Sequence, residues 1–176
     1  DLVTERCECA MMGNHAFAVL YEPTSFNTSA GQATFWTRKQ FDDEPDPEKR
    51  RKRFEYLGNL LIRRWYDGAL WVHASPRRPI NEYIFPDDAV NSPDKIDSIL
   101  ERVERLCMVG HTHVPGVFTD EPDFYPPPEL GEDCYRFGEG EKAIVNVGSV
   151  GQPRDHDARA SYVVLHPDRV EFIRVE

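Results

Sequence analysis

The feature that most constrains this chain is an apolar run that stops at a glycine and is followed by two histidines. Residues 106–109 are all apolar and lead into Gly110-His111-Thr112-His113. A short apolar run that ends at glycine predicts a buried strand that stops at a turn. Residues two apart in extended backbone project to the same side, and neutral imidazole binds Zn, Mn, Fe and Ni. The pattern predicts metal-binding side chains; the alternative is a pair of surface loop histidines without a ligand.

The same layout occurs at two other places in the sequence. Residues 7–12 form a predicted strand that runs into Gly13-Asn14-His15, and a second predicted strand at residues 69–72 ends in His73. Ligands of α/β proteins gather at the carboxyl ends of strands, so these polar groups are expected to face one cleft. The alternative for Asn14 and His15 is a turn closed by an Asx hydrogen bond, which is common.

Size and composition indicate one globular domain over residues 1–176. Apolar residues make up 40% of the chain and charged residues 30%, which suits a domain with a core of its own. No apolar run reaches membrane-spanning length and the first residues are not a signal peptide, so no membrane partner is expected.

The charge pattern limits the class of partner. A formal net charge of -10 argues against an extended nucleic-acid surface, which needs a basic stripe. The basic run at residues 49–53 is interpreted as a solvated helix face in preference to a nucleic-acid patch. A small phosphorylated substrate is compatible with this charge if bound cations supply the local positive potential.

The four cysteines, Cys7, Cys9, Cys107 and Cys134, favour a reducing compartment. Their placement suits small buried hydrophobic side chains better than a disulfide framework. No Cys-x-x-Cys pair is present, so a cysteine-based zinc site is not expected. The prediction is a cytoplasmic protein without thiol chemistry.

Local signals predict alternating helices and strands. Asn27 or Ser29 is expected to cap a helix that runs to about Gln40, and Asp46-Pro47-Glu48 to begin another. Asp67-Gly68 predicts a tight hairpin turn. The spacing of apolar residues predicts a helix over residues 94–105, with one buried face consisting of Ile96, Ile99, Leu100 and Val103. Short strands are then expected at residues 116–119, 134–137, 143–147, 161–165 and 170–175.

Taken in order, Gly13-Asn14-His15, His73 and Gly110-His111-Thr112-His113 resemble motifs of the calcineurin-like metallophosphoesterases, most closely their small bacterial and archaeal phosphodiesterase branch. Further matches are Trp36-Thr37-Arg38, His73-Ala74-Ser75-Pro76, and the segment from Asn146 through Asp155 to Ala160-Ser161-Tyr162. The resemblance covers nearly the whole chain. It implies an α/β fold, an αββα sandwich of two mixed sheets flanked by helices, with a two-metal site on loops at the strand ends.

The resemblance also implies roles for individual residues. Asn14, His73 and His111 correspond to ligands of one metal ion, and His113 to a ligand of the other. His15 corresponds to the catalytic histidine that stabilises the transition state or protonates the leaving group. Two divalent cations (Mn, Fe or Zn) would clamp the phosphoryl oxygens while a bridging hydroxide attacks in line. The implied reaction is hydrolysis of a phosphomonoester or phosphodiester.

Two arginines are candidates for substrate binding. Arg38 and Arg154 carry guanidinium groups, whose planar fork suits phosphate oxygens. The alternative is that both arginines are simply solvated. Gln152 and Asp155 are interpreted as shaping either the pocket or only the turn.

The sequence departs from the family pattern in two ways. The N-terminal Asp-x-His motif and the Gly-Asp motif with its bridging carboxylate are absent from the sequence, so three family ligands are missing. The chain is expected to correspond to the C-terminal two-thirds to three-quarters of the fold without its first strands, and to hold one cation or none by itself. A fragment is favoured over a naturally short protein, since losing those strands would expose a sheet edge. Ala16 stands where the family has an acidic residue, which leaves His15 less constrained.

These departures keep a second function open. A phosphoesterase-fold binding or scaffold protein with impaired catalysis is the alternative to an enzyme. A nuclease is a third possibility, and the net acidity counts against it. The sequence does not fix the substrate, the metal or the oligomeric state.

Overall fold

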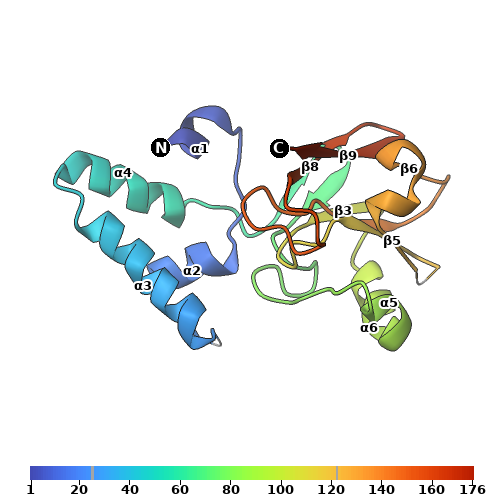
Figure 1. Cartoon of the computed structure of the whole chain (residues 1–176), viewed down its shortest axis with the longest axis horizontal. Helices are drawn as coiled ribbons and strands as arrows, with labels where there is room; N and C mark the ends of the chain where they lie inside the picture. Colours follow the sequence, from blue (N-terminus) through green and yellow to red (C-terminus); the bar gives the residue numbers. More distant parts are fainter. Residues whose placement is uncertain (25, 122) are drawn as a thin grey trace. The chain divides into compact units, whose positions relative to one another are not determined.

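A computed structural model describes residues 1–24, 26–121 and 123–176, which form two compact units (Figure 1). Residues 1–62 make a helical unit, and residues 63–176 contain the β-sheets. Throughout the described residues, no helix has both the length and the apolar character needed to cross a membrane. The assignment of residues 1–176 to one domain stays a prediction.

The helical unit contains α1 (Leu2–Arg6), α2 (Asn14–Leu20), α3 (Thr28–Asp42) and α4 (Pro47–Gly58). The side chain of Asn27 accepts a hydrogen bond from the backbone N–H of Ala30 at 2.9 Å and caps α3. Asp46 caps α4 by accepting from the N–H of Glu48 at 2.9 Å, with Pro47 in the first turn. Both predicted helix starts are therefore confirmed, because the capping signals act within one helical turn.

The strand expected at residues 7–12 does not form. This segment makes one isolated parallel bridge, from Met11 to Leu61, within the described residues. Cys7 and Cys9 are exposed, so the prediction of small buried side chains is wrong for these two. It is confirmed for Cys107, where burial raises the pKa of the thiol to about 12 and keeps it uncharged.

Most side chains of the basic run on α4 form ion pairs, and Arg50 donates to the carbonyl oxygen of Asp42 at 3.2 Å. Arg51 contacts Glu48 and Glu55, and Arg53 contacts Glu44. Pairs three or four residues apart on one helix are typical of a solvated helix face, as predicted for residues 49–53.

The second unit contains two sheets. The larger has the strand order β1 (Arg64–Tyr66), β2 (Ala69–Trp71), β3 (Leu106–Val109), β7 (Ala143–Asn146), β4 (Gly116–Thr119) and β5 (Phe124–Tyr125). The smaller has the order β6 (Cys134–Arg136), β9 (Arg169–Val175) and β8 (Ala160–Leu165). Two 3-10 turns, η1 (Pro127–Glu129) and η2 (Gly131–Asp133), lie between β5 and β6.

Parallel and antiparallel pairs are separated in this topology. Strands β2, β3 and β7 are mutually parallel, while β1, β4 and β5 pair antiparallel with their neighbours. The smaller sheet is wholly antiparallel, which differs from the expected second mixed sheet. The β1–β2 hairpin turns at Asp67 and Gly68, whose φ values of 50° and 74° match the predicted tight turn.

Alternate residues of the larger sheet pack on opposite faces. Cys107 and Val109 contact the helical layer of α5 (Asp88–Asn91) and α6 (Pro93–Leu100), where Ile96 and Ile99 are fully buried. Leu106 and Met108 pack instead against β9 of the smaller sheet. The layers of this unit are thus helix, sheet and sheet. The predicted α/β fold with two packed sheets and flanking helices is confirmed, with α5 and α6 on the outer face of the larger sheet.

We predict that Ile144→Ala lowers the free energy of unfolding by about 2–5 kcal/mol, because it leaves a cavity in a closely packed layer. Ile144 is fully buried on β7, between β3 and β4. Urea unfolding followed by far-ultraviolet circular dichroism measures the change. Val150→Ala is the control, since Val150 is 70% exposed and its truncation should change stability by less than about 0.5 kcal/mol. Equal losses for the two variants would contradict the packing described.

Candidate metal centre

Three parallel strands bring their carboxyl ends to one edge of the larger sheet. His73 follows β2, His111 follows β3, and Asn146 is the last residue of β7. The backbone N–H of Gly110 donates to the carbonyl oxygen of His73 at 2.9 Å, which fixes the spacing of the first two strand ends. The predicted grouping of polar residues at strand ends is therefore present for His73 and His111.

His73 and His111 direct ring nitrogens at each other. The Nε2 atom of His73 lies 3.1 Å from the Nδ1 atom of His111, and the rings are edge-on with centroids 4.9 Å apart. Two imidazole ligands of one cation, each about 2.0–2.1 Å from it, place their nitrogens about 3.0–3.4 Å apart. The separation of the two nitrogens is therefore in the range for two ligands of one divalent cation, which would replace the proton that the two rings share in this hydrogen bond.

The backbone carrying the two loop histidines is left-handed and not extended. His111 has φ 64° and His113 has φ 63°, so the expected extended geometry is wrong. Left-handed backbone at non-glycine residues costs on the order of 1–3 kcal/mol each, and such residues cluster at functional sites. The strain must be offset by contacts from elsewhere in the fold.

One such contact sets the protonation of His113. Its Nδ1 atom lies 2.7 Å from the carbonyl oxygen of Gln152, and the backbone N–H of Arg154 donates to the carbonyl oxygen of His113 at 3.1 Å. A carbonyl oxygen only accepts, so Nδ1 carries the proton. In the neutral ring Nε2 then holds the lone pair, as in many metal-binding histidines.

Asn146 fixes the turn between the two histidines, a role the sequence did not reveal. Its buried side-chain amide donates to the carbonyl oxygen of Gly110 at 2.8 Å and to the hydroxyl of Thr112 at 2.6 Å. Its side-chain oxygen accepts from the N–H of Gly148 at 3.0 Å. The available signal was a polar residue at the end of the apolar run 143–145, two positions before Gly148.

The segment after Asn146 requires glycine at position 148. Gly148 has φ 78°, and a Cβ there would lie 2.4 Å from the hydroxyl oxygen of Ser161. Ser161 in turn donates to the carbonyl oxygen of Val147 at 3.2 Å. This close approach holds the segment that contains Gln152 and Arg154 against β8.

The loop after His73 is held by a buried polar cluster. The fully buried Ser75 hydroxyl donates to the carboxylate of Glu82 and accepts from the N–H of Arg78 at 2.9 Å, while Arg77 pairs with Glu82. Burial disfavours the charged form of Glu82, but hydrogen bonds from Arg77 and Ser75 and the charge of Arg78 outweigh it. The pKa of Glu82 is consequently held below its ordinary value.

A second feature missed at the sequence level is an aromatic side chain against His111. The ring of Tyr83 stacks on that of His111 with centroids 4.0 Å apart and an interplanar angle of 30°. Phe85 stacks on Tyr83 at 5.2 Å and 4°. The sequence could not reveal this contact, because a ring contact across 28 positions leaves no local pattern.

Asn14 and His15 lie in the other unit. Asn14 is the first residue of α2, after the N-cap Gly13, and the His15 ring lies 4.9 Å from that of Phe26. Their convergence with His73 and His111 stays a prediction, as do the roles of Asn14 as ligand and His15 as catalytic residue.

Arg38 has a structural use in the helical unit. Its Nε donates to the carbonyl oxygen of Val19 at 2.7 Å, and Nη2 donates to those of Ala18, at 2.9 Å, and Tyr21. These are carbonyl groups at the end of α2, which intrahelical hydrogen bonds leave unsatisfied. Contact of Arg38 with a substrate phosphate stays a prediction.

Arg154 is exposed and lies on the segment that adjoins His113. Its Nη2 donates to the side-chain oxygen of Gln152 at 2.9 Å. The neighbouring Asp155 forms an ion pair with Arg174 of β9, with both side chains largely buried, so it anchors this segment. Arg154 thus stands on a fixed backbone beside the candidate metal ligands, and its contact with substrate stays a prediction.

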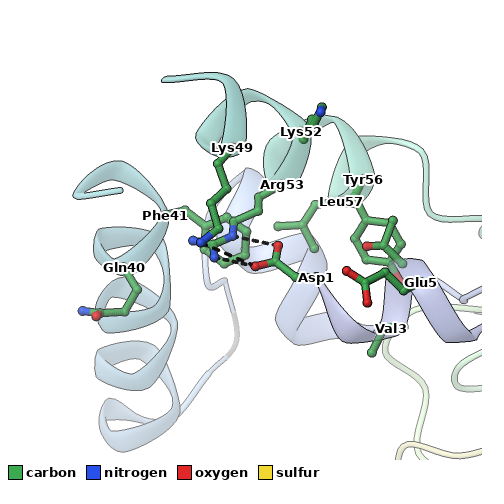
Figure 2. Close-up of a pocket in the computed structure, with 11 residues that line it drawn as sticks. Asp1, Val3, Glu5, Gln40, Phe41, Lys49, Lys52, Arg53, Tyr56 and Leu57 are labelled. Carbon is green, nitrogen blue, oxygen red and sulfur yellow. Dashed lines mark hydrogen bonds and ion pairs between the residues drawn. The ribbon is translucent and has the colours of Figure 1, made fainter. Parts of the chain in front are cut away.

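The helical unit contains a pocket of about 660 Å³ (Figure 2). It is lined by side chains from α1, α3 and α4. Its basic residues are ion-paired, since Arg53 contacts Asp1 at 2.7 Å and Glu44 at 2.6 Å, and Lys49 contacts Glu44 at 3.6 Å. None of the predicted ligands lines it, so it is not the candidate metal centre.

Within the described parts of the chain, no group of three or more His, Cys, Asp or Glu side chains is placed to hold a metal ion. The donors brought together are the His73–His111 pair, and His113 follows on the same turn.

Comparisons with known proteins decide the family. No family profile matches the sequence. Over its full length the chain is 31% identical to an uncharacterized protein of Methanocaldococcus jannaschii, of which it spans 68%. It is also 33% identical to a metallophosphoesterase of Sphaerobacter thermophilus, whose crystal structure superposes with a TM-score of 0.71. This chain belongs to the metallophosphoesterase superfamily.

The metallophosphoesterase match covers 94% of this chain and 65% of the other. A hypothetical protein of Pyrococcus horikoshii, 16% identical, shares the fold with a TM-score of 0.66 over 99% of this chain and 66% of that one. The chain therefore spans about two thirds of the length of these relatives.

We predict that Asn146→Leu destabilises the turn between His111 and His113, because the carbonyl oxygen of Gly110 and the N–H of Gly148 lose their partner. The expected loss is about 1–3 kcal/mol in the free energy of unfolding, together with shifted imidazole resonances of both histidines. Asn91→Leu, at an exposed position, is the control and should leave the resonances unchanged. Unshifted resonances in Asn146→Leu would contradict the role given to Asn146.

Glu82 predicts a pH dependence of stability. Because its pKa is lowered in the folded state, its stabilisation is present above its unfolded value of 4.5 and is lost as the pH falls through the folded pKa. We expect Glu82→Gln to lose about 1–3 kcal/mol at pH 7 and to lose less further stability than the parent protein on acidification below about pH 4.5. Unfolding free energies measured from pH 7 to pH 3 test this. Glu101→Gln, whose side chain is 77% exposed, should follow the parent curve.

Proposed function

We propose that the protein is a metal-dependent hydrolase of phosphomonoesters or phosphodiesters with a dinuclear centre. The observation that supports it is the 3.1 Å separation between His73 Nε2 and His111 Nδ1, at the carboxyl ends of adjacent parallel strands. The membership of the metallophosphoesterase superfamily supports the same reaction class.

The proposed ligands divide between two positions. His73 and His111, joined by Asn14, would hold one cation, and His113 would contribute to the second through Nε2. When bound, divalent cations supply positive charge to the phosphoryl oxygens and activate a water nucleophile. Imidazole and amide ligands suit Mn, Fe or Zn alike, so manganese is one candidate among three.

The remaining residues have positioning and proton-transfer roles in this proposal. The Gln152 carbonyl keeps His113 in the tautomer that presents Nε2. His15 would protonate the leaving group or stabilise the transition state. Arg154 would contact substrate phosphate from the segment beside His113, and Arg38 would use the edge of its guanidinium not engaged with α2.

The proposed substrate is a small phosphorylated compound. An acidic chain repels an anionic polymer, whereas a small ester can be attracted locally by bound cations. A cytoplasmic location stays a prediction, motivated by four free cysteines.

We predict that His111→Ala and His73→Ala each reduce Mn²⁺-dependent hydrolysis of bis(p-nitrophenyl) phosphate at least about 100-fold and weaken Mn²⁺ binding about 10–100-fold or more. The assay uses the whole gene product, with bound metal measured by calorimetry. His166→Ala is the control, because His166 lies beside Glu171 near the β8–β9 turn. It should retain both properties.

Two results would overturn the proposal. Turnover by the parent protein no greater than that of His111→Ala would exclude hydrolysis and favour the binding or scaffold protein. Unchanged Mn²⁺ affinity in both His73→Ala and His111→Ala would exclude these residues as ligands.

A further inference from the structure

The ring of His111 is contacted both at its edge and on its face. Its Nδ1 atom lies 3.1 Å from Nε2 of His73, and the Tyr83 ring stacks on it with centroids 4.0 Å apart and an interplanar angle of 30°. The torsion that turns an imidazole ring is broad, so rotamer preferences alone leave the orientation of a histidine ring loosely defined. Contacts of the ring must therefore fix the direction in which Nδ1 points.

The segment that carries Tyr83 is fixed both before and after this residue. The preceding residue, Glu82, accepts a hydrogen bond from the buried hydroxyl of Ser75 in the loop after β2. The following residue, Ile84, is 2% exposed and packs in the layer of α5 and α6. Phe85 then stacks on Tyr83 with centroids 5.2 Å apart and an interplanar angle of 4°. The Tyr83 ring is thus held against His111 before any ligand binds.

The second loop histidine shows how a neighbouring group can orient a ring. The Nδ1 atom of His113 lies 2.7 Å from the carbonyl oxygen of Gln152. Loss of a group that orients a metal-binding histidine typically costs about 10–100-fold in metal affinity. Stacking by Tyr83 is a weaker restraint than such a hydrogen bond, because an aromatic pair contributes about threefold to tenfold to an equilibrium constant.

We infer that Tyr83 is a positioning residue, which holds the His111 ring with Nδ1 directed at the cation position shared with His73. The inference rests on the proposed function, and in it Tyr83 contacts neither the cation nor the substrate. Stacking restricts the rotation of an imidazole ring without engaging its nitrogen atoms. Tyr83 is 41% exposed, so its truncation is expected to affect this ring more than the folding of the chain.

The first test uses the whole gene product without metal. Imidazole ¹⁵N resonances report the tautomer and hydrogen bonding of a histidine, and they depend little on the ring currents of neighbouring aromatic groups. In Tyr83→Leu the resonances of His73 Nε2 and His111 Nδ1 should move toward those of a histidine that exchanges freely between tautomers. Tyr83→Phe keeps the stacked ring and should retain the parent resonances.

The second test measures Mn²⁺ binding by calorimetry. Tyr83→Leu should weaken binding about threefold to tenfold, and Tyr83→Phe should restore the parent affinity. Phe85→Leu should weaken binding less than Tyr83→Leu, because Phe85 acts on His111 only through the Tyr83 ring. Tyr162→Leu replaces a tyrosine of similar exposure, 43%, on β8 and should have no effect. The urea midpoint of Tyr83→Leu should fall less than that of Ile144→Ala.

The third measurement separates positioning from substrate contact. The KM of Tyr83→Leu for bis(2-hydroxyethyl) phosphate at saturating Mn²⁺ should equal that of the parent protein. A raised KM with unchanged Mn²⁺ affinity would overturn the inference, because Tyr83 would then act on the substrate. Unchanged nitrogen resonances, unchanged Mn²⁺ affinity, or a urea midpoint as low as that of Ile144→Ala would overturn it as well.

Failure of the inference is distinguishable from failure of the proposed function. A parent protein that binds Mn²⁺ and hydrolyses the ester, with an affinity that does not depend on Tyr83, contradicts the inference alone. A parent protein that binds no Mn²⁺ or hydrolyses no ester contradicts the proposed function. The nitrogen resonances of the metal-free protein then decide separately whether Tyr83 orients the His111 ring.

Discussion

The parallel pairing of β3 with β2 and β7 is the constraint on which the rest of this structure depends. Because β3 has four residues, all buried, it needs a layer on each face: α5 and α6 on one, the smaller sheet on the other. The same pairing brings three strand ends to one edge. The backbone hydrogen bonds between these strands therefore place His73, His111 and Asn146 next to one another.

Holding His111 and His113 in left-handed backbone requires more than the ladder. The turn between them is tied to β2 through the His73 carbonyl, to β7 through Asn146, and to the segment after β7 through Gln152 and Arg154. Net contributions of about 0.5–1.5 kcal/mol per hydrogen bond are enough, in sum, to offset a few kcal/mol of strain. Because this turn is hydrogen-bonded to three other segments of the chain, the His111 and His113 backbone needs no further ordering when a ligand binds.

Structural features that depend on residues close together in the chain could be predicted from the sequence, whereas contacts between distant residues could not. The caps at Asn27 and Asp46, the hairpin at Asp67 and the apolar face of α6 depend on residues within a few positions of one another. The left-handed histidines depend on an asparagine more than 30 positions away, which no local pattern reveals. The histidine pair was predicted because a strand-ending glycine followed by ligating side chains is itself a local signal.

Other differences arise where one residue type serves two purposes. Alternation at residues 7–12 suggested a strand, but in the described chain the segment finds a single bridge and so cannot bury its cysteines. Guanidinium chemistry at Arg38 suited phosphate, yet the same planar fork satisfies the last carbonyl groups of α2. The N–H groups of a guanidinium suit phosphate oxygens and backbone carbonyl oxygens alike, so the sequence does not decide which of the two Arg38 contacts.

Charge in this chain also explains how the candidate site differs from a basic phosphate pocket. Arg53, Arg77 and Arg174 form ion pairs with carboxylates, so they neutralise charge locally and add little positive potential. In the proposed function, attraction of an anionic ester would therefore fall to cations held by neutral ligands such as His73 and His111.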